Sequence, residues 1–169
     1  MLTALLFSAA LVFSTGALDN QGAPLSWRYT CYNVREPSPP VSWSGAPDSA
    51  QSMLLVLDAP DRPLGVDVHW LVFNLPPQAG GLPEDTPKQP RLDDGAVQGR
   101  NDMGGNGYLA PCPPIGTAFT YRFTLYALNT LLDLGPDASA DDVLNAAMGH
   151  VLDQAQLSGT YLRPAWPWG

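Results

Sequence analysis

One histidine stands in an apolar run of the chain, just after a turn rich in aspartate and proline. His69 lies in residues 68–75, where Asn74 is the only other polar residue, and Asp61 lies in the preceding turn. An imidazole and a carboxylate at this spacing could hydrogen-bond a ligand or act as an acid and base pair. The alternative is a core histidine whose ring is satisfied by backbone groups.

A second candidate segment is rich in glycine and proline and leads into another strand-like run. Residues 104–114 read GGNGYLAPCPP, and residues 119–128 read FTYRFTLYAL. Loops of this kind bring backbone N–H groups close to a ligand, because glycine has no side chain. Residues 105–110 also match the dinucleotide fingerprint G-x-G-x-x-A, but the prolines that follow exclude the helix that a pyrophosphate needs. The two segments together predict a small binding pocket.

Other catalytic and metal motifs are missing from the sequence. It contains no G-x-S-x-G elbow, no P-loop and no H-E-x-x-H motif. His69, His150 and the two cysteines lack the spacing of a zinc site, so we expect neither a metal nor a cofactor and interpret His150 as structural. A hydrolase or transferase that uses His69 with Asp61 stays open, but no activated nucleophile supports it, and we expect no enzyme.

The elements that position these residues read as mainly β. Residues 53–57 form a continuous apolar run, typical of a strand buried on both faces, and residues 68–75 form a second. Residues 121–128 alternate, with Tyr121 and Phe123 on the face opposite Arg122. Eighteen prolines and sixteen glycines indicate many turns between short strands. No internal repeat or second domain is visible.

One helix is signalled near the C-terminus. Ser139 is a suitable N-cap and Asp142 stands at the capping-box position. The expected apolar face consists of Val143, Leu144, Ala147 and Met148. Periodicity alone would continue this helix through residue 155, but Gly149 favours a break.

Composition and the first residues predict an exported single domain. The net charge of −8 argues against nucleic acid and against an anionic membrane surface as partners. Residues 2–13 are apolar but too short to span a bilayer, and small residues follow, as in a secretory signal peptide. We expect residues 1–17 to be removed, leaving a domain of residues 18–169 that is periplasmic or secreted. An apolar first strand or an uncleaved anchor is the alternative.

The chain has two cysteines, Cys31 and Cys112. If it is exported, both pass through an oxidising compartment, where a pair tends to close into a disulfide. The bridge would join an N-terminal strand to the proline-rich loop. Two free, buried thiols are the alternative.

Six motifs in order resemble the phosphatidylethanolamine-binding protein (PEBP) family, in its bacterial and archaeal Raf kinase inhibitor-like branch. They are SPPVSW (38–43), DAPDRP (58–63), HWLVFNLP (69–76), GRNDMG (99–104), GYLAPCPP (107–114) and FTYRFTLYAL (119–128). The resemblance implies a fold of antiparallel sheets packed as a β-sandwich, with one or two short helices near the C-terminus. It further implies that residues 149–161 (GHVLDQAQLSGTY) form a returning strand. It also implies a small surface pocket for phosphate-like anions and phosphorylated head groups.

Carried over by position, the resemblance implies a ligand-binding site made of Asp61, His69, Pro113, Pro114 and Tyr121. His69 and Tyr121 would donate hydrogen bonds to phosphate oxygens, while a carboxylate would fix the imidazole tautomer.

Two departures from the family pattern change this site. Ala59 stands where the family has its first pocket aspartate, and Phe119 stands where it has a second histidine. The first change removes a repulsive charge and the second removes a donor, so their effects on phosphate affinity oppose each other.

The resemblance favours a binding protein for a small phosphorylated or amphipathic ligand, without stable membrane insertion. A protease inhibitor or protein-binding regulator that uses the same scaffold, with a protein target, is the alternative. Kinase regulation conflicts with export.

Overall fold

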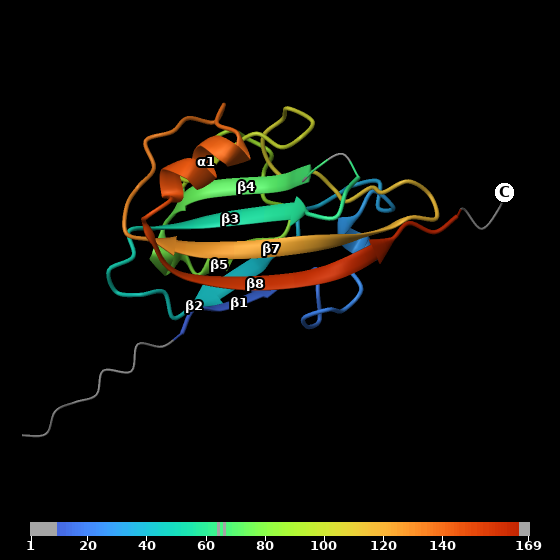
Figure 1. Ribbon diagram of the computed structural model, residues 1–169, viewed down its shortest axis with the longest axis horizontal. Coiled ribbons are helices and arrows are strands. Elements are labelled where there is room, and N and C mark those ends of the chain that lie inside the picture. Colours follow the sequence, from blue (N-terminus) through green and yellow to red (C-terminus); the bar gives the residue numbers. More distant parts are fainter. Residues whose placement is uncertain (1–9, 64, 66, 166–169) are drawn as a thin grey trace, which may run out of the picture.

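Two antiparallel sheets and one α-helix make up the described part of the chain, residues 10–63, 65 and 67–165, in the computed structural model (Figure 1). The larger sheet has the order β6-β4-β3-β7-β8 and the smaller one the order β1-β2-β5. The strands are β1 Val12–Thr15, β2 Val41–Ser44, β3 Ser52–Ala59, β4 Asp67–Leu75, β5 Gly81–Leu82, β6 Val97–Gln98, β7 Ala118–Leu128 and β8 Val151–Leu162. The α-helix is α1, Ala140–Ala147, and 3-10 turns span Trp27–Tyr29 and Pro77–Ala79.

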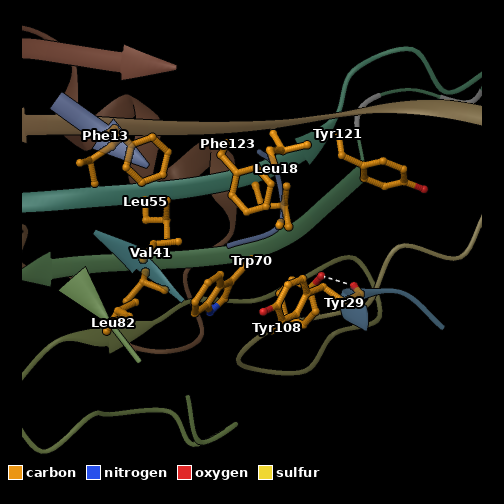
Figure 2. Packing of buried hydrophobic residues seen from close by; sticks show 14 of the residues in the cluster. Phe13, Leu18, Tyr29, Val41, Leu55, Trp70, Leu82, Tyr108, Tyr121 and Phe123 are labelled. Carbon is orange, nitrogen blue, oxygen red and sulfur yellow. Dashed lines mark hydrogen bonds between the residues drawn. The ribbon is translucent and has the colours of Figure 1, made fainter. Parts of the chain in front are cut away.

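The two sheets pack face to face, as the predicted β-sandwich requires. Phe13, Val41 and Leu82 from the smaller sheet share one buried cluster with Leu55 and Phe123 of the larger sheet (Figure 2). Apolar side chains on the inner faces of two sheets bury each other, which is the main favourable contribution to folding. The mainly β, sandwich-type fold is therefore confirmed.

Strand β3 is buried on both faces, as its continuous apolar run predicts. Leu55 and Leu57 join the core between the sheets, whereas Leu54 and Val56 join a second cluster on the other face. That second cluster includes residues of α1, which lies beside β4 (Figure 1). The larger sheet is thus the middle layer, between the smaller sheet and the helix.

The helix begins where the sequence predicts, but its apolar face is narrower. The Ser139 hydroxyl accepts from the Asp142 N–H at 3.2 Å, and the Asp142 carboxylate accepts from the Ser139 N–H at 2.9 Å, which is the predicted capping box. Val143 and Ala147 are buried. Leu144 and Met148, which we expected on the same face, are 37% and 73% exposed. A helix of eight residues lies over one sheet face and buries only the positions that point straight at it.

The segment after the helix is the predicted returning strand. Gly149 has φ +82°, a left-handed conformation that ends the helix at little cost for glycine. Strand β8 then pairs with β7 along its length, from Leu128 opposite Val151 to Ala118 opposite Leu162. This pairing forms one edge of the larger sheet.

The expected leader falls partly outside the described residues, which begin at residue 10. Within them, β1 pairs with β2, and Leu11 and Phe13 are each 8% exposed in the core. Ala17, after which we expect cleavage, is 1% exposed in the same cluster. Cleavage there would remove β1, and leader removal stays a prediction. The described residues include no helix long and apolar enough to cross a membrane.

Candidate functional site

His69 is the extra residue of a β-bulge in β4. Leu57 of β3 pairs with Trp70, and the next residue, Asp58, pairs with Val68, so the pairing skips His69. Bulges re-aim a side chain and occur often beside functional sites. The apolar run in the sequence shows no sign of this bulge, because it depends on how β4 registers against β3.

A backbone carbonyl fixes the tautomer of His69. Its Nδ1 lies 2.9 Å from the carbonyl oxygen of Leu109, and the Leu109 N–H donates back to the His69 carbonyl at 2.7 Å. Because a carbonyl oxygen only accepts, Nδ1 carries the proton, and in the neutral ring Nε2 is an acceptor. The expectation that a carboxylate fixes this tautomer is wrong. The carbonyl of Leu109, which lies on another segment of the chain, does so instead.

Burial keeps the His69 ring neutral near pH 7. The residue is 5% exposed, and this desolvation lowers its pKa, outweighing the Leu109 hydrogen bond and the nearby Asp102, which raise it. The positive charge of Arg62 lowers the pKa further. A neutral ring with a protonated Nδ1 has no N–H left on Nε2 for a phosphate oxygen, so the expected donor is an acceptor in this structure.

Tyr121 packs edge to face against His69. The two ring centres lie 5.2 Å apart at 78°, and Tyr121 is 1% exposed. Figure 2 shows Tyr121 at one end of the core cluster, with its hydroxyl directed away from the other labelled side chains. Burial raises the pKa of its phenol, the charge of Arg62 opposes this, and the charge of Asp61 adds to it. Tyr121 is therefore a neutral hydroxyl at physiological pH.

Of the other residues predicted for the site, Asp61 acts electrostatically on Tyr121, whereas Pro113 and Pro114 are held by hydrogen bonds of their own. Both carboxylate oxygens of Asp61 accept from the Thr120 N–H, at 3.0 and 3.1 Å, so that Asp61 is held beside β7. The carbonyl of Pro113 accepts from Arg163 at 3.3 Å, and that of Pro114 from the Thr117 N–H at 3.0 Å. The two prolines belong to the loop that includes Leu109, but these hydrogen bonds hold them to the ends of β7 and β8.

Asp61 and His69 are not hydrogen-bonded as an acid and base pair. The Asp61 carboxylate accepts from the Thr120 N–H of β7, and His69 Nδ1 donates to the Leu109 carbonyl. Within the described residues there is also no group of three or more histidine, cysteine, aspartate or glutamate side chains that could hold a metal ion.

Arg62 is a site residue that the sequence analysis missed. Its guanidinium carbon lies 5.8 Å from the centre of the Phe119 ring, and its Nη1 forms an ion pair with Asp67. Its charge lowers the pKa of both His69 and Tyr121, which places it beside both rings. The signal was present in the DAPDRP turn, where the arginine directly follows Asp61.

Three buried side-chain polar atoms in the described residues have no hydrogen-bond partner, and all three lie in this region. They are Arg62 Nε, His69 Nε2 and the hydroxyl of Tyr161. Tyr161 is opposite Phe119 in the pairing of β7 with β8, and it also acts electrostatically on Tyr121. We call these five residues, Arg62, His69, Phe119, Tyr121 and Tyr161, the His69 cluster. Since buried polar groups are paired in the great majority of cases, these three atoms are exceptions and mark the cluster as the candidate site.

A disulfide holds the loop that orients His69. Cys31 and Cys112 are bonded, and the Cys31 N–H donates to the carbonyl of Pro111 at 3.1 Å. The described residues therefore include no free thiol. Cys31 does not lie in an N-terminal strand, as we expected, but in the turn after the Trp27–Tyr29 helix. Three residues beyond Leu109, the bridge fastens the loop to a segment far away in sequence.

Comparison with known proteins identifies the family. The profile of the phosphatidylethanolamine-binding protein family matches residues 15–162. A Methanothermobacter thermautotrophicus protein is 51% identical over 149 residues, which cover 88% of this chain and 97% of that protein. A relative from Pyrococcus horikoshii is 41% identical over 139 residues, which cover 80% of this chain and 69% of that protein.

Solved structures agree with the sequence relatives. A Chlamydia trachomatis protein described as a PEBP homologue has a TM-score of 0.81 and 34% identity, covering 91% of this chain and 98% of that chain. The Escherichia coli protein YbcL, described as a new member of the mammalian PEBP family, has a TM-score of 0.82 and 28% identity, covering 91% and 99%. Because the motifs, the sandwich fold and the family profile coincide over nearly the whole chain, this protein belongs to the phosphatidylethanolamine-binding protein family.

Proposed function

We propose that this PEBP-family protein binds a small ligand carrying a phosphoryl group at the His69 cluster. The observation that supports the proposal is the convergence there of all three unpartnered buried polar atoms of the described chain. Leaving such an atom without a partner costs about 1 to 3 kcal/mol, so the arrangement lowers the stability of the protein without a ligand. A ligand that offers both oxygen acceptors and a hydroxyl donor would satisfy all three.

The charge of the cluster favours an anion. Arg62 is permanently cationic, and guanidinium groups bind phosphoryl oxygens through charge-assisted hydrogen bonds. His69 and Tyr121 are both neutral at physiological pH, for the reasons given above, and they add no charge of their own. Several carboxylates also lie nearby. Asp61 accepts from the Thr120 N–H with both oxygens, Asp67 pairs with Arg62, Asp58 pairs with Arg122, and Asp102 acts on His69. The proposal assigns the cluster a binding role and no reaction.

Titration with phosphoethanolamine, followed by calorimetry, tests the proposal. We expect saturable binding by the unaltered protein, and a loss of about tenfold or more in His69→Ala, because that change removes one of the three polar atoms and the ring that packs on Tyr121. His150→Ala is the matched control, since His150 is exposed and its ring contacts Asn129 at 2.8 Å.

Near-UV circular dichroism shows whether each variant keeps its fold. Equal affinity in His69→Ala and in the unaltered protein would contradict the proposed site. If no phosphorylated compound binds the unaltered protein, the inhibitor or protein-binding regulator becomes the better hypothesis.

We infer further that the protein works in the periplasm or outside the cell. The support is the disulfide between Cys31 and Cys112, because such bonds persist in oxidising compartments. Intact mass of the exported product tests this and locates the cleavage site. A product that begins near Leu18 would lack β1, whereas one that still begins at Met1 and stays in the cytoplasm would contradict export.

A further inference from the structure

We infer that the His69 cluster selects a phosphoryl group that keeps one proton: His69 Nε2 accepts a hydrogen bond from P–OH, while Arg62 Nε and the Tyr161 hydroxyl donate to its charged oxygens. This inference rests on the proposed function and specifies the chemical form of the ligand.

The acceptor follows from the geometry of the histidine. Nδ1 is fixed as a donor by the Leu109 carbonyl at 2.9 Å, and Nε2 is buried without a partner. In the neutral ring that nitrogen offers a lone pair and no hydrogen. The ligand group that faces Nε2 must therefore bring its own hydrogen.

The charged and titratable groups around the ring come from four segments. Asp58 lies at the end of β3, Arg62 in the turn before β4, Asp102 in the loop after β6, and Tyr121 on β7. None of them donates a hydrogen bond to Nε2, which has no partner anywhere in the described chain. The lone pair is therefore unused within the described chain.

The two donors come from the turn before β4 and from β8. Arg62 uses Nη1 for Asp67, and its Nε is buried without a partner. Tyr161 is 6% exposed, opposite Phe119, over which the guanidinium of Arg62 lies. An oxygen that meets these donors can carry full negative charge. The cluster thus combines one acceptor with two donors, which matches a monoprotonated phosphoryl group.

Sulfate is the natural probe for this arrangement. It has the tetrahedral shape of phosphate, but it carries no proton at neutral pH, so that one of its oxygens would face the buried lone pair of Nε2. Sites built to hydrogen-bond a hydroxyl strongly reject an analogue that lacks it, because a buried polar group is left unpaired.

The experiment measures binding of inorganic phosphate and of sodium sulfate to the unaltered protein at pH 7. We expect phosphate to bind about 30-fold or more tightly than sulfate. If the two bind equally, the inference fails while the proposed function stands. If neither binds and phosphoethanolamine also fails, the proposed function fails too.

A pH series with phosphoethanolamine tests the proton directly. The second pKa of a phosphate monoester is about 6, so we expect affinity to fall about tenfold for each pH unit between pH 7 and pH 9. A flat profile would overturn the inference.

Variants separate the acceptor from the donors. His69→Ala should bring phosphate binding down to the level of sulfate. Arg62→Gln should weaken both anions and keep the preference, whereas Arg35→Gln, at an exposed arginine outside the cluster, should change neither. A preference for phosphate that survives in His69→Ala would contradict the role of Nε2.

Nitrogen-15 NMR reads the tautomer without any substitution in the cluster. The chain has two histidines, so His150→Ala assigns the remaining ring signals to His69. We expect a proton on Nδ1 and none on Nε2 at pH 7. A ring protonated on Nε2 would overturn the inference.

Discussion

After its first residue, Asp67, strand β4 contains two polar side chains, His69 and Asn74, which lie near its opposite ends. Each lies next to a shift in the pairing with β3. Asn74 has φ +58°, and its amide exchanges two hydrogen bonds with the backbone of Leu132, at 2.8 and 2.9 Å. His69 uses one ring nitrogen for Leu109 and leaves the other unpartnered.

The difference separates a structural polar residue from a residue with a proposed binding role within a single strand. Asn74 closes a connection between β4 and the segment after β7, and its oxygen and nitrogen both have partners inside the protein. His69 is more deeply buried than Asn74, yet one of its two ring nitrogens has no partner in the described chain. Both residues lie near an end of the strand, and the hydrogen-bond count is what separates their roles.

The largest expected effect is the loss of stability when the disulfide that holds the Leu109 loop beside His69 is reduced. The bridge between Cys31 and Cys112 spans 81 residues in sequence, for which the chain-entropy model gives a stabilisation of about 4 to 5 kcal/mol. Urea unfolding with and without reductant should show a loss of this size, with weaker phosphoethanolamine binding because the Leu109 loop is released. The double variant Cys31→Ser, Cys112→Ser should match the reduced protein. An unchanged midpoint would show that the loop is held by its hydrogen bonds alone.

Asn74→Ala should be the next largest change, with an effect on stability only. The change leaves the Leu132 N–H and C=O without their side-chain partners. It also places alanine, which has a Cβ but no polar side-chain atom, at a positive φ. We expect the free energy of unfolding to fall by about 2 to 4 kcal/mol. Asn74→Gly is the matched control, because it removes the same hydrogen bonds but tolerates this φ, and it should be more stable than Asn74→Ala by about 1 kcal/mol. Calorimetry should find phosphoethanolamine affinity unchanged in both. A loss of affinity would mean that the two ends of β4 are coupled.

The smallest expected effect is the pH dependence that His69 adds to stability. Its pKa is lowered in the folded protein, so the unfolded chain takes up the proton more readily below about pH 6.5. The free energy of unfolding is therefore undiminished above that pH and falls as the pH drops toward the lowered pKa. Urea unfolding between pH 5 and 7.5 should show this slope in the unaltered protein and in His150→Ala, and a shallower one in His69→Ala. Equal slopes in all three would assign the dependence to other groups.

Local patterns were enough to predict most of the fold. The apolar run at residues 53–57 became a strand buried on both faces, Ser139 and Asp142 formed their capping box, and Gly149 ended the helix. These predictions succeed because each depends on neighbours a few residues away, or on the two faces of one strand. The helix face was the exception, since exposure of Leu144 and Met148 depends on how much of the sheet α1 covers.

For the candidate site, the motifs indicated residues but not their hydrogen-bond roles. The motifs pointed to His69, Tyr121 and Asp61, and the structure packs the first two against each other. The tautomer was mistaken, because it is set by Leu109, forty residues away in sequence. Arg62 and Tyr161 carry no pattern of their own that marks them as partners of His69.

The sequence alone determined which segments become strands, where the helix begins, and that a histidine and a tyrosine of known motifs are present, because side-chain type and short-range spacing control these features. Only the tertiary structure decided what those residues can do. The register of β4 against β3 makes His69 a bulge, the Leu109 loop turns its ring into an acceptor, and the pairing of β7 with β8 brings Tyr161 opposite Phe119. Hydrogen-bond roles depend on which distant groups meet, and that is settled when the sheets close on one another.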